Sequence, residues 1–352
     1  MCGPLRIASP TCSPCCGGPT HVTHPTAQAV STRFTAVRLS PGLRAVAARA
    51  IVLATAALMA AVWLCGCGQS GARQVVVYTS QDQVFAEPVL KEFTRQTGIK
   101  VNAVFDSEAV KTVGLVNRLL AERDHPQCDL FWNNEELRTR QLAAQNGCSS
   151  WVALEGHCRF RRLVVNTNRV AADHVPRSLS ELTNAAWRGK IALAYPLFGT
   201  TATHFLALRQ QWGEVRWEAW CRALQANKPM VVDGNSVVVK QVGRGEAWVG
   251  LTDSDDIAAA RREGLPVAGV SLGADTLTIP NTVAIVKGSP HEALATELVA
   301  YLQTTEVKAR LAQMNAFEAV GESGSPMLQV RWESLLAEMQ PALKKLELIF
   351  LR

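Results

Sequence analysis

Residues Gln74 to Phe105 carry a hydrophobic pattern that predicts a strand, a helix and a second strand in succession. A β-branched run, Val75–Thr79, leads into a polar loop, and after that loop large apolar residues recur at every fourth position. A second alternating run, Ile99–Phe105, follows. The recurring positions share one helical face; they are Phe85, Val89 and Phe93.

Strand–helix–strand units place helices against a mostly parallel sheet. The loop after the first strand then lies at the carboxyl edge, where open α/β sheets bind ligands. We therefore expect Ser80, Gln81 and Asp82 to face a ligand. The alternative is a turn and a helix cap only, because Asp82 can cap the helix and Gly98 suits the left-handed position after it.

Three further predicted strands also end in polar residues just before a helix start. Asp129–Asn134 reads as a short buried strand that ends in polar residues, and Lys190–Tyr195 and Met230–Asp233 each lead into a helix start. Hydroxyls and free N–H groups at the positive end of a helix form a cradle for anions. Simple helix capping is the alternative. The expected ligand-binding residues are Trp132, Asn133, Asn134, Glu135, Gly199, Thr200, Thr201, Asn235 and Ser236.

The most acidic cluster of the chain follows another expected strand, Ala247–Leu251. It comprises Asp253, Asp255 and Asp256. Three carboxylates at a helix start are favoured by the helix dipole, which gives a structural interpretation. The functional interpretation is a site for a cation or an amine.

Several other segments also predict elements. Arg162–Asn166 and Leu277–Val286 read as strands that cross between two lobes, and Ser178–Glu181 matches a capping box at a helix start. Glu108–Arg123 reads as a helix, and helices at His291–Gln303, 306–314 and 330–348 end the chain.

The charge is concentrated at the amino end. The 352-residue chain has a net charge of +6, and residues 1–66 contain five arginines and no acidic residue, so the remainder carries +6 − 5 = +1. This length suits two domains. A nearly neutral body without a basic stripe argues against nucleic acid as a partner.

The amino-terminal part reads as an export signal. Ala50–Leu64 is an apolar run behind Arg49 that is too short to span a bilayer comfortably. The tetrad Leu64-Cys65-Gly66-Cys67 resembles the lipobox of bacterial lipoproteins, which implies lipidation of Cys67 and a tether at 68–73. An ordinary cleaved signal is the alternative. For residues 1–49 we expect a disordered extension or a start placed too far upstream.

Four cysteines remain in the exported body: Cys128, Cys148, Cys158 and Cys221. An oxidising compartment permits disulfides, of which Cys148–Cys158 is the closest pair in sequence. Buried free thiols are the other interpretation.

Six ordered motifs now stand together: VVVYTSQDQVFAEPVLKEFTRQTGIKV, DLFWNNE, PLFGTTATH, DGNSVV, GLTDSDD and IPNTVAIVKGSPH. Over residues 74–352 they resemble the extracellular solute-binding proteins of bacterial ABC importers, in the ferric-iron-binding branch. The resemblance implies an α/β, two-lobed periplasmic binding protein (Venus-flytrap, type II). The implied lobes are 74–165 with 280–312 and 166–279 with 313–352.

The same resemblance implies a role in transport. It implies a monomer in the periplasm or at the cell surface that delivers a small ligand or metal ion to an ABC permease and its ATPase subunit. Two crossover strands would act as hinges near Leu163–Asn166 and Leu277–Asn281. Ferric iron would be transported cargo, and no catalytic cofactor is implied.

The substrate implied by the resemblance has weaker support in the residues. The iron-binding relatives place two adjacent tyrosines where this chain has Ser254-Asp255, and a first-loop histidine is replaced by Asp82. A hard ferric ion prefers anionic oxygen ligands. The implied metal ligands are Asp82, Glu135, Asp253 and Asp255. The alternative ligand is a phosphate ester, a phosphonate or another oxyanion held by the anion cradle.

Two other function classes stay open, an enzyme and a ligand sensor on the same fold. The chain lacks the G-x-S-x-G elbow, the H-E-x-x-H motif, the P-loop and the dinucleotide fingerprint. These absences favour a binding protein over an enzyme.

Overall fold

The computed structural model describes residues 73–105, 111–317 and 327–351. Ser70–Arg352 forms one compact unit. The predicted extension, the apolar run Ala50–Leu64, the lipidation site Cys67 and most of the tether lie outside the described residues, as does the start of the predicted helix at Glu108. Among the described helices, none combines the length and the apolar character needed to cross a membrane.

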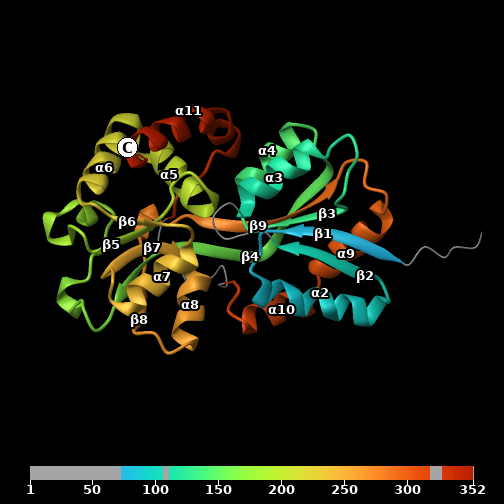
Figure 1. Ribbon diagram of the computed structural model, residues 1–352, viewed down its shortest axis with the longest axis horizontal. Helices are drawn as coiled ribbons and strands as arrows, with labels where there is room; N and C mark the ends of the chain where they lie inside the picture. The colour runs from blue at the N-terminus through green and yellow to red at the C-terminus, as the bar shows by residue number, and fades with distance from the viewer. Residues whose placement is uncertain (1–72, 106–110, 318–326, 352) are drawn as a thin grey trace, which may run out of the picture. The chain divides into compact units, whose positions relative to one another are not determined.

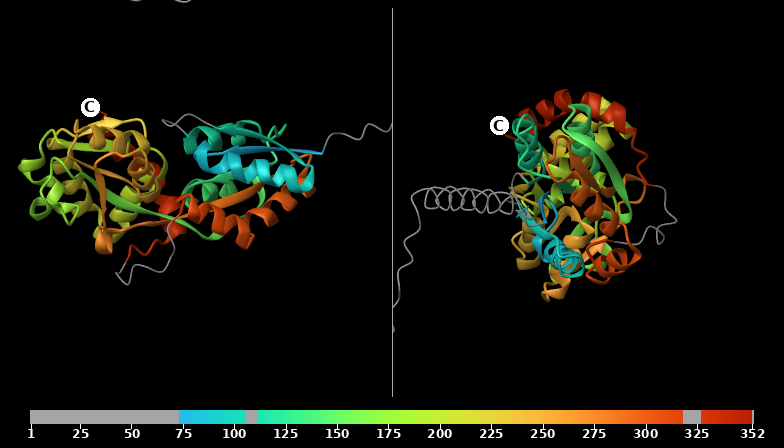
Figure 2. Two further views of the ribbon diagram at one scale, coloured as in Figure 1. Left: turned by 90° about the horizontal axis from the view of Figure 1, so that it is seen from below. Right: turned by 90° about the vertical axis from the view of Figure 1, so that its right-hand side faces the viewer.

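The described elements form two groups, each built on a β-sheet (Figures 1 and 2). In the first sheet, β1 (Gln74–Thr79) pairs in parallel with β2 (Lys100–Phe105) and β3 (Leu130–Asn133). β9 (Thr278–Val286) is antiparallel to β3. The first lobe is therefore the mostly parallel sheet that the pattern predicts.

Alternate strand residues of the first lobe face two apolar layers. Val75 and Val77 pack with α2 (Gln83–Thr97), α9 (Glu292–Leu302) and α10 (Thr305–Gln313). Tyr78 and Phe131 pack on the other face with α3 (Lys111–Ala121) and α4 (Glu136–Ala144). Burial on both faces explains why these strands read as nearly continuous apolar runs.

The second lobe repeats this arrangement. β5 (Ile191–Ala194) pairs in parallel with β6 (Met230–Val232) and β7 (Val249–Asp253), and β8 (Val267–Val270) is antiparallel to β4 (Cys148–Asn166). One face carries α5 (Gly199–Trp212), α6 (Glu214–Ala226) and α11 (Trp332–Phe350), and the other carries α7 (Asn235–Arg244) and α8 (Ser254–Arg262). Short 3-10 turns lie at Ala172–His174, Ser180–Thr183, Ala185–Trp187 and Gly273–Asp275.

Strand β4 joins the two sheets. It pairs with β9 from Cys148 to Phe160, and from Arg161 onward it pairs with β7. β9 follows the same path in the opposite direction, so both predicted crossover strands are present. The sequence predicted only the last part of β4, because a register irregularity between Ala153 and Cys158 interrupts the regular alternation.

Three local predictions differ from the structure. Asp82 occupies the N-cap position of α2 but its side chain makes no capping hydrogen bond, whereas Gly98 takes the expected left-handed position at φ 70°. At Ser178 the expected hydrogen bond of the box is present, from Glu181 N to Ser178 Oγ at 3.4 Å, but it starts a 3-10 turn instead of an α-helix. Cys148 and Cys158 are free thiols, so the suggested disulfide is absent.

Candidate ligand-binding site

A small cavity lies where the carboxyl ends of strands from both sheets meet. About 50 Å³ is open to the centres of water-sized molecules. The described residues that line it are Asp82, Thr112, Asn134, Arg159, Ala194, Tyr195, Phe198, Gly199, Thr200, Thr201, Asp233, Gly234, Asn235, Asp253 and Asp256. Both lobes contribute to its wall, as expected for a ligand held between them.

Four helices begin at this cavity. The N-cap residues or first residues of α2, α5, α7 and α8 all belong to its wall. Among the described residues, none of these four N-termini is capped by a side-chain hydrogen bond from its N-cap residue. The first N–H groups of a helix have no partner within the helix, and the dipole makes that end positive. The four helix starts therefore contribute backbone donors and partial positive charge to the wall, and both favour an oxyanion.

Gly199 lets α5 start at the cavity wall. Its φ is +53°, a left-handed value that costs other residues strain, and a Cβ there would meet no atom within 4 Å. The need for glycine at this position is therefore conformational and not steric. The turn positions Thr200 and Thr201 at the cavity.

A buried arginine, Arg161, forms the base of the site on β4. Its Nη1 donates to Asp253 Oδ1 at 2.7 Å, to Asn235 Oδ1 at 2.9 Å and to Thr200 Oγ1 at 3.3 Å. Asp253 Oδ2 also accepts from Thr200 Oγ1 at 2.7 Å and from Asn235 Nδ2 at 3.1 Å. Arg161 is 0% and Asp253 1% exposed, so this network fixes the wall in a low-dielectric environment.

A second buried arginine, Arg159, reaches the cavity from the same face of β4. Its Nη1 lies 3.0 Å from Asp255 Oδ2, and its Nη2 donates to Gln81 Oε1 at 3.1 Å. Burial lowers the pKa of Arg159, but the carboxylates around it raise the pKa more strongly, so this side chain stays charged. Within the described part of the chain, Arg159 Nε has no hydrogen-bond partner. A buried donor without a partner at a cavity wall is a candidate ligand contact.

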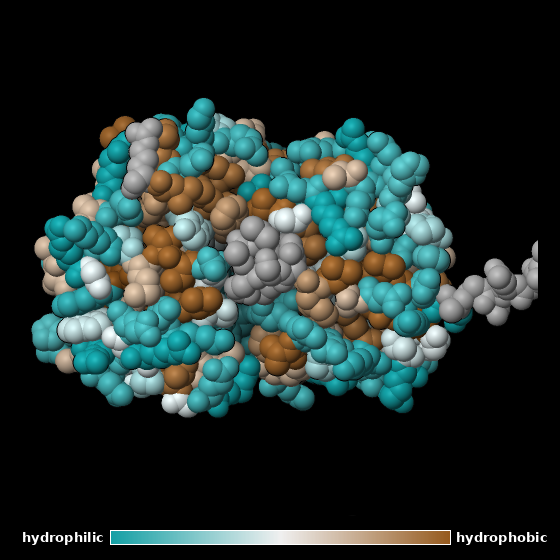
Figure 3. Space-filling model, viewed as in Figure 1, coloured by the Kyte–Doolittle hydropathy of each residue, from teal (hydrophilic) through white to brown (hydrophobic). Residues whose placement is uncertain are grey.

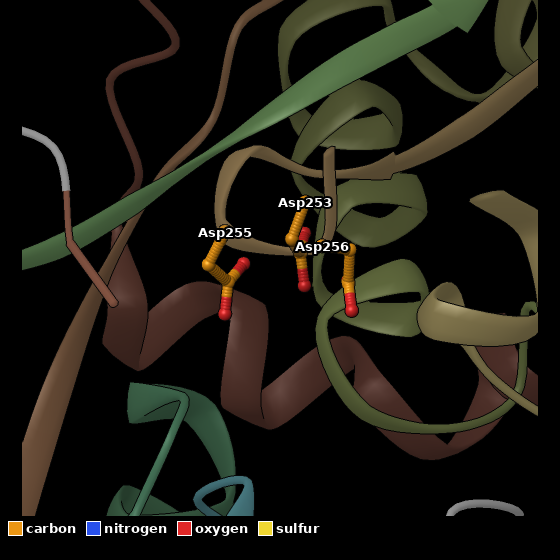
Figure 4. Close-up of side chains that lie close together, drawn as sticks. All are labelled: Asp253, Asp255 and Asp256. Atoms are coloured by element: carbon orange, nitrogen blue, oxygen red, sulfur yellow. The ribbon is translucent and has the colours of Figure 1, made fainter. Parts of the chain in front are cut away.

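Asp253, Asp255 and Asp256 project in the same direction from the start of α8 (Figure 4). One carboxylate oxygen from each lies within 4.8 Å of the others. Burial raises the pKa of Asp255 to about 7, although Arg159 acts in the opposite sense.

The structure brings about half of the predicted ligand-binding residues to the cavity wall. These are Asp82, Asn134, Gly199, Thr200, Thr201 and Asn235. The others lie outside the lining: Ser80, Gln81, Trp132, Asn133, Glu135 and Ser236. Several of these hold the wall in place; Ser80 Oγ, for example, donates to Asn133 Oδ1 at 2.7 Å and accepts from Asn134 N at 2.8 Å.

Of the four predicted metal ligands, Asp82 and Asp253 line the cavity. Asp255 lies beside them, but its carboxylate is paired with Arg159. Glu135 is fully buried outside the lining and accepts from Arg138 N at 3.1 Å and from Thr203 Oγ1 at 3.2 Å. Burial raises the pKa of Glu135 to about 7. The hydrogen bond from Thr203 to Glu135 joins the start of α4 in the first lobe to α5 in the second lobe.

Sequence reasoning missed Arg159, Arg161, Thr112 and Tyr195. The two arginines alternate with Phe160 in the segment that precedes the predicted crossover strand. Charged residues at alternate positions of a strand that leads into an apolar run indicate either an exposed face or a buried ion-pair network. The acidic cluster Asp253, Asp255 and Asp256, elsewhere in the chain, is the signal that favours a buried ion-pair network.

The remaining tyrosines and the histidine of α5 have other roles. Tyr78 donates to Glu122 Oε2 at 3.0 Å, and Tyr301 packs on Phe93. His204 is buried, its Nε2 lies 2.8 Å from Asp275 O, and burial lowers its pKa to about 3. Of the three tyrosines, therefore, Tyr195 alone lines the cavity among the described residues.

The sequence profile described as bacterial extracellular solute-binding protein matches residues 74–314. The chain belongs to this family. Its relatives include the major ferric iron-binding protein of Neisseria meningitidis serogroup B, which is 24% identical over 271 residues, covering 69% of this chain and 79% of the relative.

Solved structures share the fold of this solute-binding protein at low identity. Iron-bound HitA from Pseudomonas aeruginosa superposes with a TM-score of 0.68 at 20% identity, covering 78% of this chain and 99% of HitA. AfuA from Actinobacillus pleuropneumoniae, with fructose-6-phosphate bound, gives 0.70 at 18% identity, covering 79% and 98%. These likenesses establish the two-lobed α/β architecture; the bound ligands belong to those proteins.

Proposed function

We propose that this protein is the solute-binding component of an ABC importer and captures a small oxyanion-bearing solute, such as a phosphate ester or phosphonate, between its lobes. The solute is handed to a membrane permease driven by its ATPase subunit. The protein acts as a monomer, binds without turnover and is held at the membrane by lipid on Cys67. The family's extracellular description supports the setting.

The observation that carries the proposal is Arg159, which lines a cavity where α5 and α7 also begin and whose buried Nε has no hydrogen-bond partner among the described residues. A guanidinium buried away from water recognises phosphate well, because its planar donors match the oxygens and bind them more strongly in a low dielectric. Helix N-termini add further donors without adding side-chain charge. An oxyanion would therefore satisfy groups that the described residues leave unsatisfied.

Ferric ion is the second candidate. The close carboxylates of Asp253, Asp255 and Asp256 support it, as do the ferric iron-binding relative in Neisseria and the iron-bound structure of HitA. Against it, Asp253 and Asp255 already pair with Arg161 and Arg159. These ligands would have to leave their guanidinium partners to coordinate a metal.

The substitution Arg159→Met separates the two candidates, because it changes their affinities in opposite directions. For an oxyanion, the loss of the guanidinium removes a charge-assisted contact, and we expect affinity for a phosphonate to fall at least tenfold. For ferric ion, the same change releases carboxylate charge, so affinity for iron from ferric citrate would rise. Calorimetric titration of both ligands measures these effects.

The matched control is Arg222→Met. Arg222 pairs with Glu218 on α6, its side chain is 64% exposed, and it lies outside the cavity lining. It should leave both affinities unchanged. If the wild-type protein binds no phosphonate, and an Arg159→Met protein that is folded by circular dichroism binds iron more tightly than the wild type, the ferric proposal replaces the oxyanion proposal.

A further inference from the structure

We infer that Gln81 is a positioning residue for ligand binding, which fixes the guanidinium of Arg159 so that its Nε–H points at the bound oxyanion. Gln81 lies outside the described lining of the cavity, so it acts through Arg159 and not by touching the ligand. This inference rests on the proposed function and deepens it, because it names the residue that sets the geometry of the oxyanion contact.

The side-chain amide of Gln81 is buried against Arg159. Gln81 is 2% exposed, and its Oε1 accepts a hydrogen bond from Arg159 Nη2 at 3.1 Å. Within the described part of the chain, Nε2 of the same amide has no hydrogen-bond partner, so the bond to Arg159 is the one that the amide makes there. Burying an amide costs free energy unless hydrogen bonds compensate for the lost water. The contact with Arg159 is therefore the compensation that the structure shows for burying this side chain.

Two contacts at different nitrogens fix the plane of the Arg159 guanidinium. Its Nη1 lies 3.0 Å from Asp255 Oδ2, and its Nη2 donates to Gln81 Oε1. A contact at Nη1 alone would leave the group free to turn about that contact, and the second contact at Nη2 removes this freedom. Because the guanidinium is rigid and planar, fixing two of its nitrogens also fixes the direction of the Nε–H bond. Nε is the nitrogen of Arg159 that has no hydrogen-bond partner among the described residues.

The loop that carries Gln81 is itself anchored to the first sheet. Next to Gln81, the backbone N–H of Ser80 donates to Trp132 O on β3 at 3.1 Å. Asp255, by contrast, lies at the start of α8 in the second lobe. The guanidinium of Arg159 is thus held from both lobes, so its orientation toward the ligand depends on how the lobes are placed. Gln81 is the contact that supplies this link from the first lobe.

The test is a double-mutant cycle on the full-length protein, with methylphosphonate and glycerol 3-phosphate as probes in calorimetric titration. Gln81→Met removes the acceptor and nearly keeps the size of the side chain. We expect it to weaken binding of a probe at least about fivefold, because the Nε–H of Arg159 loses its fixed direction. In the Arg159→Met background the same substitution should change affinity by less than about twofold, since no guanidinium remains to be positioned.

A spectroscopic readout distinguishes positioning from a general loss of structure. In protein labelled with nitrogen-15 arginine, the Nε–H signal of Arg159 is the one that disappears in Arg159→Met. In the wild type this signal should exchange slowly with water and should shift when a probe binds. In Gln81→Met it should exchange faster, because the group is no longer held, while the Nε–H signals of the other arginines keep their rates.

The matched control is Gln83→Met, the same substitution two positions further along the chain. Gln83 is exposed, and its Nε2 donates to Glu87 Oε2 at 3.0 Å. This variant should leave both the affinities and the Nε–H signal of Arg159 unchanged. Gln81→Asn keeps the amide but shortens the arm that carries it, so it should act in the same direction as Gln81→Met and serves if Gln81→Met does not fold.

The outcomes separate this inference from the proposed function. An equal loss of affinity for Gln81→Met in both backgrounds would overturn the inference and leave the oxyanion proposal standing, because the role of Gln81 would then be structural. Wild-type affinity in Gln81→Met would overturn it as well. Failure of the wild-type protein to bind either probe would overturn the proposed function and this inference together.

Discussion

The substitution Arg161→Met tests whether the base of the cavity is a buried ion-pair network. The side chain lost is 0% exposed, and its Nη1 serves Asp253, Asn235 and Thr200. Removing one partner of a buried pair leaves the other charge without compensation and typically costs about 3–5 kcal/mol. Because Thr200 and Asn235 still donate to Asp253, we place the expected loss near the lower end, at about 3 kcal/mol.

Urea unfolding followed by tryptophan fluorescence measures this loss as a change in midpoint at constant slope. The double variant Arg161→Met with Asp253→Asn removes both charges and should recover at least about 1 kcal/mol of it. Arg222→Met removes an exposed pair on α6 and should cost less than about 1 kcal/mol. A loss below 1 kcal/mol for Arg161→Met, or no recovery in the double variant, would refute the buried network.

Three other predictions concern pH, packing and motion. Burial raises the pKa of Glu135 from 4.5 to about 7, so between these pH values the folded protein binds a proton that the unfolded chain has released, and the free energy of unfolding falls as pH rises. Glu135→Gln should remove up to roughly 3 kcal/mol of this fall. Parallel curves of unfolding free energy against pH for the two proteins would contradict this prediction. Gly250→Ala places a Cβ 2.5 Å from Val238 Cγ1 and 3.0 Å from Ala192 O, so it should lower the free energy of unfolding by about 1–3 kcal/mol. An unchanged midpoint of thermal unfolding would show that β7 shifts to accept the methyl group. Ligand binding should close the lobes about β4 and β9 and reduce the radius of gyration in X-ray scattering, and an unchanged value at saturation would exclude closure.

Much of the fold could be predicted because the local pattern and the tertiary burial agree. β1 and α2 are read from a β-branched run followed by apolar residues at every fourth position, and Gly98 ends the helix where its conformation is required. β4 shows the opposite case. Its regular alternation is interrupted near Gly156, and its polar positions are buried by partners distant in sequence, such as Asp253.

The site could be predicted only in part, for a related reason. Strand ends and helix starts are local signals, and they located Thr200, Asn235 and Asp82 at the wall. The distinction between a residue that lines the cavity and one that supports it is not local. Glu135 and Asn134 are neighbours in sequence, but Glu135 accepts a hydrogen bond from Thr203 in the second lobe while Asn134 reaches the cavity.

The apolar surface adds little to the argument about function. On the face shown in Figure 3, hydrophobic residues form patches that are broken up by polar residues. The cavity wall, by contrast, combines charged side chains with helix N-termini and is the basis of the proposed ligand recognition.

The most direct test of the proposed oxyanion ligand is the content of phosphorus and iron per molecule of full-length protein purified without chelators or phosphate buffers. We expect close to one phosphorus atom per protein, without iron, and a phosphorus-31 signal that disappears on unfolding and dialysis. One iron atom per protein without phosphorus would contradict it, because the carboxylates around Arg159 would then hold a metal and not an organic oxyanion.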